Sequence, residues 1–268
     1  MNCPNFIVIG AQRAGTTWLH LCLNEHPEIF LPEEKEIHFF DLHYEKGLHW
    51  YFEHFKGEDK VLNGEITPNY YQYPEALARM KQNVPDAKII FILREPKSRA
   101  ISQFDLFKQD NFKNFTFAQA IEKHPVIIDL SLQGLHLQRL YEHFEHDQVL
   151  VLLYDELANN PRKLLHKVTK FLGISSQFTP SLLHKKMNKV VFPKTQAFIR
   201  KIGLSWLIEL AKKSRYSERV KKLGERKPVN NNSFKIDDDV QQCFLKDIEL
   251  IEQLTGKNLS HWKLKVSS

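Results

Sequence analysis

The stretch FIVIGAQRAGTTWLHLCL, from Phe6 to Leu23, constrains the fold more than any other part of this chain. An apolar run typical of a β-strand stops at Gly10, a short polar loop extends to Gly15, and a helical pattern follows. This order is typical of a phosphate-binding loop, in which backbone N–H groups at a helix N-terminus hold an anion. The ATP and GTP version requires a lysine directly after its second glycine, where this chain has Thr16, followed by Thr17. The loop therefore predicts an anion site unlike that of nucleoside triphosphatases.

Strand-like and helix-like segments alternate along the rest of the chain. We predict strands at Phe6–Ile9, Lys60–Asn63, Lys88–Leu93 and Val149–Leu153, and helices at Thr16–Glu25, Pro74–Gln82, Ser98–Lys108, Phe117–His124, Leu132–Phe144, Pro161–Leu172 and Asp237–Thr255. This alternation predicts an α/β fold, with a P-loop-like parallel sheet flanked by helices. We interpret residues 1–268 as a single domain.

The composition is that of an ordinary globular protein, with 42% hydrophobic and 26% charged residues. The apolar runs are strand-sized and shorter than the roughly 20 residues of a membrane span. No signal peptide precedes Phe6. Three cysteines, an odd number without metal-site spacing, favour a reduced cytoplasmic compartment and no bound metal.

Basic charge is concentrated between Lys185 and Lys235, which holds 15 Lys and Arg against three Glu in a chain of net charge +6. Such a segment indicates either a face that meets an anion, such as a nucleotide, an acidic glycan, a nucleic acid or a lipid surface, or a solvated helix face. Within it, Gln196–Lys213 favours a helix that packs on the core or covers the acceptor. A membrane-surface helix that gathers glycolipid acceptors is the alternative.

A second anion-binding pattern, LREPKSRAISQF, follows the predicted strand that ends at Leu93. Arg94 occupies the strand end at which nucleoside triphosphatases have a metal-binding Asp. Ser102 lies eight residues further, and an arginine and a hydroxyl can share a phosphate through charge-assisted hydrogen bonds. Open parallel sheets bind nucleotides at the carboxyl ends of their strands. The two patterns together predict a nucleotide with two separate anionic groups, held without metal.

These motifs resemble those of sulfotransferases that use 3′-phosphoadenosine 5′-phosphosulfate (PAPS). QRAGTTWL resembles their 5′-phosphosulfate loop, and Arg94 with Ser102 resembles their 3′-phosphate motif. KEIHFFD and GEITPNYY are similar to segments of the heparan and carbohydrate sulfotransferase branch, and LLYDELANNPRKLLHKVTKFLGI and LTGKNLSHW resemble bacterial members. The resemblance implies the sulfotransferase fold. It also implies in-line transfer of a sulfuryl group to a hydroxyl, or an amine, of a carbohydrate-containing acceptor, with release of 3′,5′-ADP (PAP).

The resemblance also implies roles for individual residues. The donor is expected to contact Arg13, Ala14, Gly15, Thr16, Thr17, Trp18, Arg94, Ser102 and, by a looser alignment, Arg226 and Lys227. Arg13 stands where the family has a lysine that stabilises the leaving oxygen, and arginine differs from lysine in reach and hydrogen-bond geometry. Glu36 is the expected general base, ionised at neutral pH, with His38 as the alternative. Lys35 is expected to contact the sulfonate. Glu65 is expected to orient the acceptor, pair with the base, or form a structural ion pair.

Two other functions stay open on the residues alone. A small-molecule kinase of the P-loop class fits the loop but lacks its lysine and its strand-end Asp. A noncatalytic anion-binding or nucleic-acid-binding protein fits the basic segment Lys185–Lys235, although no known nucleic-acid motif accompanies it. The expected partners are therefore a nucleotide and a glycan or glycolipid-like acceptor, without nucleic acid. A peripheral contact with a membrane surface is a further expectation.

Overall fold

The computed structural model describes residues 3–55, 61–108, 114–184 and 236–267. The chain divides into two compact units, the first formed by Met1–Leu183 with Asn232–Ser268 and the second by His184–Asn231. Apart from His184, the second unit lies outside the described residues. The predictions for the basic segment, for Gln196–Lys213 and for Arg226 and Lys227 lie outside them as well, and the single-domain interpretation stays a prediction.

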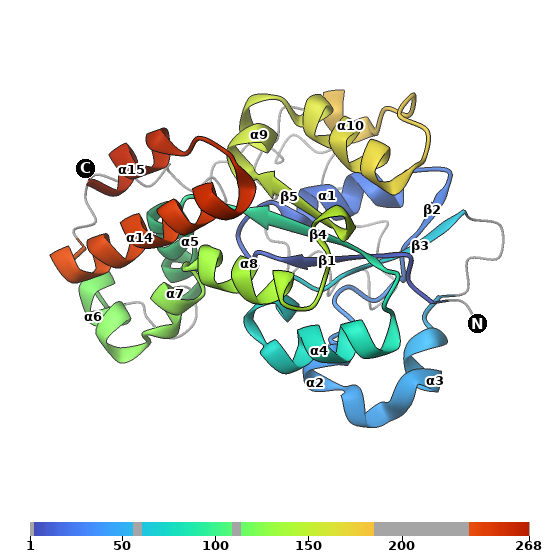
Figure 1. Cartoon of the computed structure of the whole chain (residues 1–268), viewed down its shortest axis with the longest axis horizontal. Helices are drawn as coiled ribbons and strands as arrows, with labels where there is room; N and C mark the ends of the chain where they lie inside the picture. The colour runs from blue at the N-terminus through green and yellow to red at the C-terminus, as the bar shows by residue number, and fades with distance from the viewer. Residues whose placement is uncertain (1–2, 56–60, 109–113, 185–235, 268) are drawn as a thin grey trace, which may run out of the picture. The chain divides into compact units, whose positions relative to one another are not determined.

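The first unit contains a five-stranded parallel sheet in the order β2-β3-β1-β4-β5 (Figure 1). The strands are β1 (Phe6–Gly10), β2 (Ile29–Phe30), β3 (Leu62–Ile66), β4 (Lys88–Leu93) and β5 (Val149–Leu153). The runs FIVIG and KIIFIL are almost wholly buried, as expected for strands covered on both faces. The chain fills one side of β1 with β2 and β3 and then crosses to the other side with β4. The carboxyl ends of β1 and β4 therefore flank the point where the strand order reverses, the usual ligand position in such sheets.

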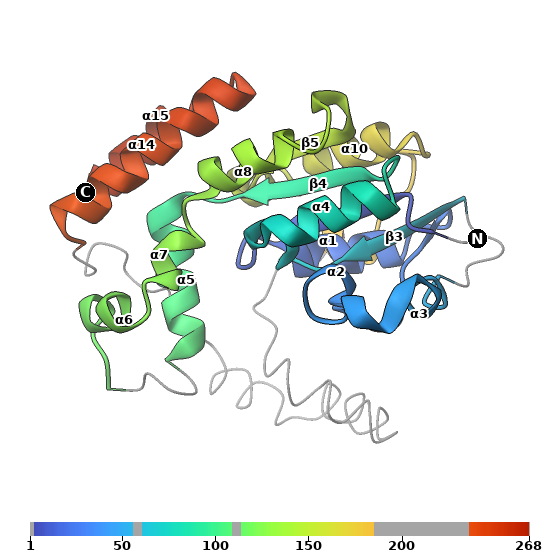
Figure 2. The same cartoon turned by 60° about the horizontal axis from the view of Figure 1, so that its bottom comes forward.

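Helices lie on both sides of this sheet (Figures 1 and 2). The α-helices are α1 (Thr16–Asn24), α2 (Phe39–Leu42), α3 (Gly47–Phe52), α4 (Pro74–Asn83), α5 (Pro96–Phe107), α6 (Phe117–Lys123), α7 (Val126–Asp129), α8 (Gln133–Tyr141), α9 (Tyr154–Asn159), α10 (Pro161–Leu172), α14 (Asp238–Thr255) and α15 (Ser260–Ser267). Within the described residues, four 3₁₀ turns accompany them: η1 (Tyr44–Lys46), η2 (Tyr70–Gln72), η3 (His146–Gln148) and η4 (Ser181–His184). Helix α10 has the predicted bounds because Asn160 caps its start and Gly173, at φ 78°, ends it.

The strand predicted at Lys60–Asn63 was wrong at both ends, because Val61 is not part of β3 and the strand continues beyond Asn63. β3 spans Leu62–Ile66 and continues through Gly64 and Glu65, whereas the prediction stopped at Asn63. Glycine and glutamate are weak strand formers, but Gly64 lies directly beneath the ring of Phe6 on β1. A Cβ at Gly64 would lie 2.1 Å from that ring, so tertiary packing overrides local propensity here.

The connection between β2 and β3 holds short helices that the sequence patterns did not predict. Phe39 and Phe40 begin α2 and are fully buried in the hydrophobic core. Phe39 stacks on Tyr51 of α3 with ring centroids 4.3 Å apart and an interplanar angle of 9°. This aromatic packing attaches the segment KEIHFFD to the sheet.

Candidate functional site

The loop between β1 and α1 leaves no room for side chains at its glycines. A Cβ on Gly10 would come within 2.5 Å of the Tyr71 ring, and one on Gly15 within 2.5 Å of Leu157. Gly15 also has φ 93°, a left-handed conformation that favours glycine. No side chain among the described residues caps α1. The N-terminal N–H groups of α1 are therefore available to an anion, as the loop pattern predicted.

The structure brings the two predicted anion-binding patterns together. Nη1 of Arg94, at the end of β4, donates a hydrogen bond of 2.6 Å to the carbonyl oxygen of Arg13 in the loop. Nε of Arg13 donates to Oγ of Ser102 on α5 at 3.0 Å. Loop, strand end and helix thus meet through residues that lie more than 80 positions apart.

Arg94 lies in a nearly closed environment. Its guanidinium stands over the Tyr154 ring, 4.6 Å from the centroid, in a cation–π contact. Burial lowers the pKa of Arg94 from its usual value, and the arginine stays charged because that value is far above neutral. Its Nε is buried and has no hydrogen-bond partner among the described residues. An unsatisfied buried donor of this kind is costly, and an anion would satisfy it.

The other residues of the loop and the start of α1 differ in their exposure to solvent. Ala14, Thr16 and Trp18 are buried, whereas Thr17 is exposed. Trp18 and Ala14 belong to the hydrophobic core and support the loop. The loop also contacts the GEITPNYY segment, since the amide of Gln12 donates to Oδ1 of Asn69.

Glu36, His38 and Asp41 form a hydrogen-bonded line in the KEIHFFD segment. Nε2 of His38 lies 3.2 Å from a Glu36 oxygen, and its Nδ1 lies 2.9 Å from Oδ2 of Asp41. The Asp41 side chain is only 1% exposed, against 28% for Glu36. The sequence analysis gave Asp41 no role, although its i,i+3 spacing from His38 was a usable signal.

These carboxylates decide the charge of His38. The hydrogen bond to Asp41, followed by that to Glu36, raises the pKa of His38 to about 10. A cationic imidazole cannot accept a proton, so this environment disfavours His38 as the base and keeps its charge beside Glu36.

We expect His38 to keep its proton through neutral pH and to lose it near pH 10, observable as the imidazole C–H shift in an NMR titration. Because the folded pKa lies above the ordinary 6.5, the imidazolium stabilises the fold; this contribution is fully present below about pH 6.5 and is lost as pH rises through about 10. Asp41→Asn should lower the midpoint. A wild-type midpoint between 6 and 7 would contradict the assignment.

Lys35 lies beside α1. Burial lowers the pKa of Lys35, while the neighbouring Glu36 opposes that change. Burial, with a contribution from the charge of Lys35, also lowers the pKa of His20 to about 4. Lys35, the first residue of the KEIHFFD segment, is thus close enough to α1 to affect the charge of His20.

Glu65 is surrounded by hydroxyl groups inside the protein. Its side chain is buried, with the residue 1% exposed, so direct contact with an acceptor has no support. Its carboxylate accepts hydrogen bonds from the Tyr51 hydroxyl, from Oγ1 of Thr67 at 2.8 Å and from the Tyr70 hydroxyl at 2.6 Å. Oη of Tyr70 in turn accepts from the backbone N–H of Phe39 at 2.8 Å. Glu65 therefore supports the segment that carries Glu36, through hydroxyl partners rather than an ion pair.

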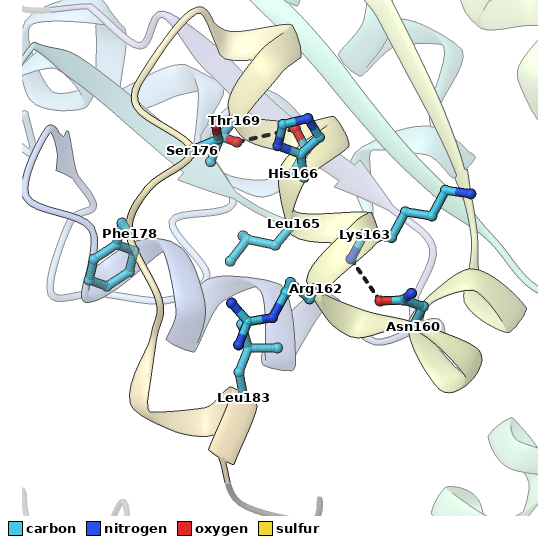
Figure 3. A pocket seen from close by; sticks show the side chains of 9 residues that line it. All are labelled: Asn160, Arg162, Lys163, Leu165, His166, Thr169, Ser176, Phe178 and Leu183. Atoms are coloured by element: carbon cyan, nitrogen blue, oxygen red, sulfur yellow. Dashed lines mark hydrogen bonds between the residues drawn. The ribbon is translucent and has the colours of Figure 1, made fainter.

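A cavity of about 360 Å³ lies apart from these residues, against α10 (Figure 3). It is lined by Asn160, Arg162, Lys163, Leu165, His166, Thr169, Ser176, Phe178 and Leu183. None of the predicted site residues lines it. Among the described residues, no group of three or more His, Cys, Asp or Glu side chains could hold a metal ion. No described helix is both long and apolar enough to cross a membrane.

The fold and the loop define an α/β protein with an uncapped helix N-terminus where β1 meets α1 and a half-buried arginine at the neighbouring strand end. The sulfotransferase domain family matches residues 4–222. The chain belongs to this family.

Similar proteins agree with that assignment. Human heparan sulfate glucosamine 3-O-sulfotransferase 3B1 is 32% identical over 209 residues, covering 73% of this chain and 50% of that protein. The chain thus spans half of that relative's length. A sulfotransferase structure from Alicyclobacillus acidocaldarius has a TM-score of 0.71 at 23% identity, covering 98% of this chain and 100% of that one. Mouse sulfotransferase SULT7A1, solved with PAP, has a TM-score of 0.52 at 20% identity, covering 98% and 88%. These two structures show the fold.

Proposed function

We propose that this protein transfers a sulfuryl group from PAPS to a hydroxyl of a carbohydrate-containing acceptor and releases PAP. The observation that carries the proposal is the junction of Arg94, the loop carbonyl of Arg13, and Ser102. It joins an uncapped helix N-terminus to a half-buried arginine whose Nε is buried without a hydrogen-bond partner among the described residues. Two anion positions on one nucleotide, a 5′-phosphosulfate and a 3′-phosphate, match this pair of features.

The residues present fit such a donor. The N–H groups at the start of α1 and the hydroxyls of Thr16 and Thr17 would hold the 5′-phosphosulfate. Arg94 and Ser102 would hold the 3′-phosphate, with Nε of Arg94 gaining the partner that it lacks. The PAP complex of SULT7A1, a protein of the same fold, supports this choice of nucleotide.

Arg13 would then have a separate task. Its guanidinium donates to Ser102 in this structure, and binding of a 3′-phosphate at Ser102 would compete for that hydroxyl. Released from Ser102, Arg13 would be able to neutralise charge on the leaving oxygen. Transition-state stabilisation of this kind is usually the largest single term in group transfer.

Glu36 is our choice for the general base. His38 is already protonated at neutral pH and lies 3.2 Å from Glu36, so it can orient the carboxylate but cannot remove a proton. A carboxylate is ionised at neutral pH and accepts the hydroxyl proton as the new O–S bond forms. Lys35, close to α1, would contact the sulfonate. Asp41 holds the far side of the imidazole and so positions His38.

The acceptor is proposed from the relatives. The human relative is named for 3-O-sulfation of heparan sulfate glucosamine, and a mouse relative, 33% identical over 201 residues, is named as a heparan sulfate N-deacetylase/N-sulfotransferase, so these names support a sugar acceptor that offers a hydroxyl or an amine. A glycolipid-like acceptor, contact with a membrane surface and a cytoplasmic location stay predictions.

The role of Glu95 makes a P-loop kinase the less favoured function. Glu95, the carboxylate that follows β4, accepts from the backbone N–H groups of Lys97 and Ser98 and so caps α5. It is 3% exposed and committed to that helix. This leaves the end of β4 without the Mg²⁺-binding carboxylate that kinases of this class use.

Nucleotide binding tests the proposal. By isothermal calorimetry in EDTA, we expect the protein to bind PAP tightly and 5′-ADP or ATP much more weakly. Arg94→Ala should weaken PAP binding about 100-fold, since charge-assisted hydrogen bonds contribute roughly 1.5–3 kcal/mol each, and leave 5′-ADP binding little changed. Arg162→Ala, which removes an arginine of the separate cavity, is the matched control. Mg²⁺-dependent ATP binding that exceeds PAP binding would instead support the kinase.

A further inference from the structure

The backbone of Arg94 is held by a glutamine side chain. Oε1 of Gln133, at the start of α8, accepts from the Arg94 backbone N–H at 3.0 Å, and Nε2 of Gln133 donates to the Arg94 carbonyl oxygen at 2.6 Å. Arg94 follows the last residue of β4, where the ladder to β5 has ended at Leu153. The buried side-chain amide of Gln133 therefore makes the backbone hydrogen bonds that a neighbouring strand would otherwise make with Arg94, the residue that would bind the 3′-phosphate.

Gln133 is itself placed by the C-terminal part of the chain. The carboxylate of Asp247 on α14 accepts from the backbone N–H groups of Gly134 at 2.9 Å and Leu135 at 3.1 Å. It thereby caps α8 from another helix, and α14 lies alongside α8 (Figures 1 and 2). A Cβ on Gly134 would come within 2.7 Å of the Asp247 backbone oxygen, so only glycine permits this approach. Burial raises the pKa of Asp247 to about 6, which leaves it ionised above neutral pH.

A second contact reaches Arg94 from the opposite direction. Tyr154, whose ring lies under the guanidinium, is followed by Asp155. Asp155 accepts hydrogen bonds from the ring nitrogens of His261, at 3.0 Å, and Trp262 on α15. Trp262 is fully buried. The C-terminal helices therefore support both the backbone and the side chain of Arg94.

We propose that α14 and α15 set the position of Arg94, and that Gln133 and Asp247 are positioning residues that determine the preference for a nucleotide with a 3′-phosphate. This inference rests on the proposed function. Gln133 fixes where the Arg94 backbone lies, the Asp247 cap fixes the turn that carries Gln133, and Tyr154 limits where the guanidinium points. Arg94 is thus held ready for a phosphate, and little ordering is needed on binding.

The test makes the same substitution, glutamine to methionine, at two positions. Gln133→Met keeps the length and volume of the side chain but removes both hydrogen bonds to Arg94. Gln148→Met is the matched control, because Nε2 of Gln148 also donates to a backbone carbonyl, that of Pro85 at 2.8 Å, ahead of β4 and not at its end. For each protein, the ratio of the dissociation constants for 5′-ADP and PAP is measured at pH 8.

Gln133→Met should reduce the PAP preference about tenfold, the effect of a weakened charge-assisted hydrogen bond, with 5′-ADP affinity retained. Gln148→Met should leave the ratio unchanged. Asp247→Asn should shift the ratio in the same direction, and it serves as the second variant if Gln133→Met fails to fold. The inference would be overturned if Gln133→Met folds, loses only heat stability, and keeps the wild-type ratio of the dissociation constants for 5′-ADP and PAP.

The same data separate this inference from the proposed function. Wild-type protein without any PAP preference would contradict the donor assignment itself. A wild-type preference that survives in both Gln133→Met and Asp247→Asn would leave the donor assignment intact and refute only the positioning role.

Discussion

Glu36→Gln should lower kcat by roughly 10²- to 10⁴-fold while leaving PAP affinity within about twofold of wild type, because general-base catalysis contributes on that scale and glutamine cannot accept the proton. The measurement is sulfuryl transfer from PAPS to a glycan acceptor at saturating donor, with PAP binding by calorimetry. The effect belongs in kcat because Glu36 lies in the KEIHFFD segment, hydrogen-bonded to His38, and is not among the residues assigned to the donor.

Glu34→Gln is the control for that experiment. Glu34 lies two residues earlier with its side chain 66% exposed, paired with His54 at 3.7 Å, so the same change of charge should have little effect. Full activity in Glu36→Gln would exclude Glu36 as the base. His38 would return as a candidate only if its NMR midpoint also fell near neutrality.

Arg13→Met should lower kcat by about 10²- to 10³-fold, comparable to the loss of one donor that stabilises developing charge. Arg13→Lys should keep most of the turnover, because the charge persists and the resemblance places a lysine at this position in the family. Both variants are compared with wild type in kcat and in PAP affinity. If Arg13 acts on the leaving oxygen, the loss in kcat exceeds the loss in PAP affinity.

The opposite pattern would assign Arg13 a different role. A large loss of PAP affinity with little change in kcat would mean that its hydrogen bond to Ser102 maintains the 3′-phosphate position, and that charge on the leaving group is neutralised elsewhere.

Local patterns predicted the central part of the fold well. β4 and β5 have the predicted bounds because KIIFIL and VLVLL are uninterrupted apolar runs, and α10 does because its capping residues act within one turn. The end of β3 was missed because Gly64 is accommodated by the ring of Phe6, a contact between residues 58 positions apart that no local window contains. The short helices α2 and α3 were missed for a related reason, since aromatic packing stabilises them more than helix propensity does.

In the candidate site too, local sequence patterns did not predict the contacts between residues far apart in the sequence. Sequence motifs indicated Arg94 and Ser102 because strand end and helix start are local signals. They gave no indication of Gln133 and Asp247, whose hydrogen bonds span 39 and more than 100 positions. The GEITPNYY motif drew attention to Glu65, but its partners, the hydroxyls of Thr67 and Tyr70 in the same motif and of Tyr51 on α3, became visible only in the folded chain.

The hydroxyl of Tyr70 has a consequence for how acceptor choice could change in this family. It ties the amide of Phe39 to a carboxylate inside β3, so the segment that carries the proposed base, Glu36, is anchored to the sheet. If Glu36 is the base, residues facing the acceptor can be exchanged without displacing it. New acceptors become accessible through surface substitutions alone, while the interior that aligns the reaction stays the same.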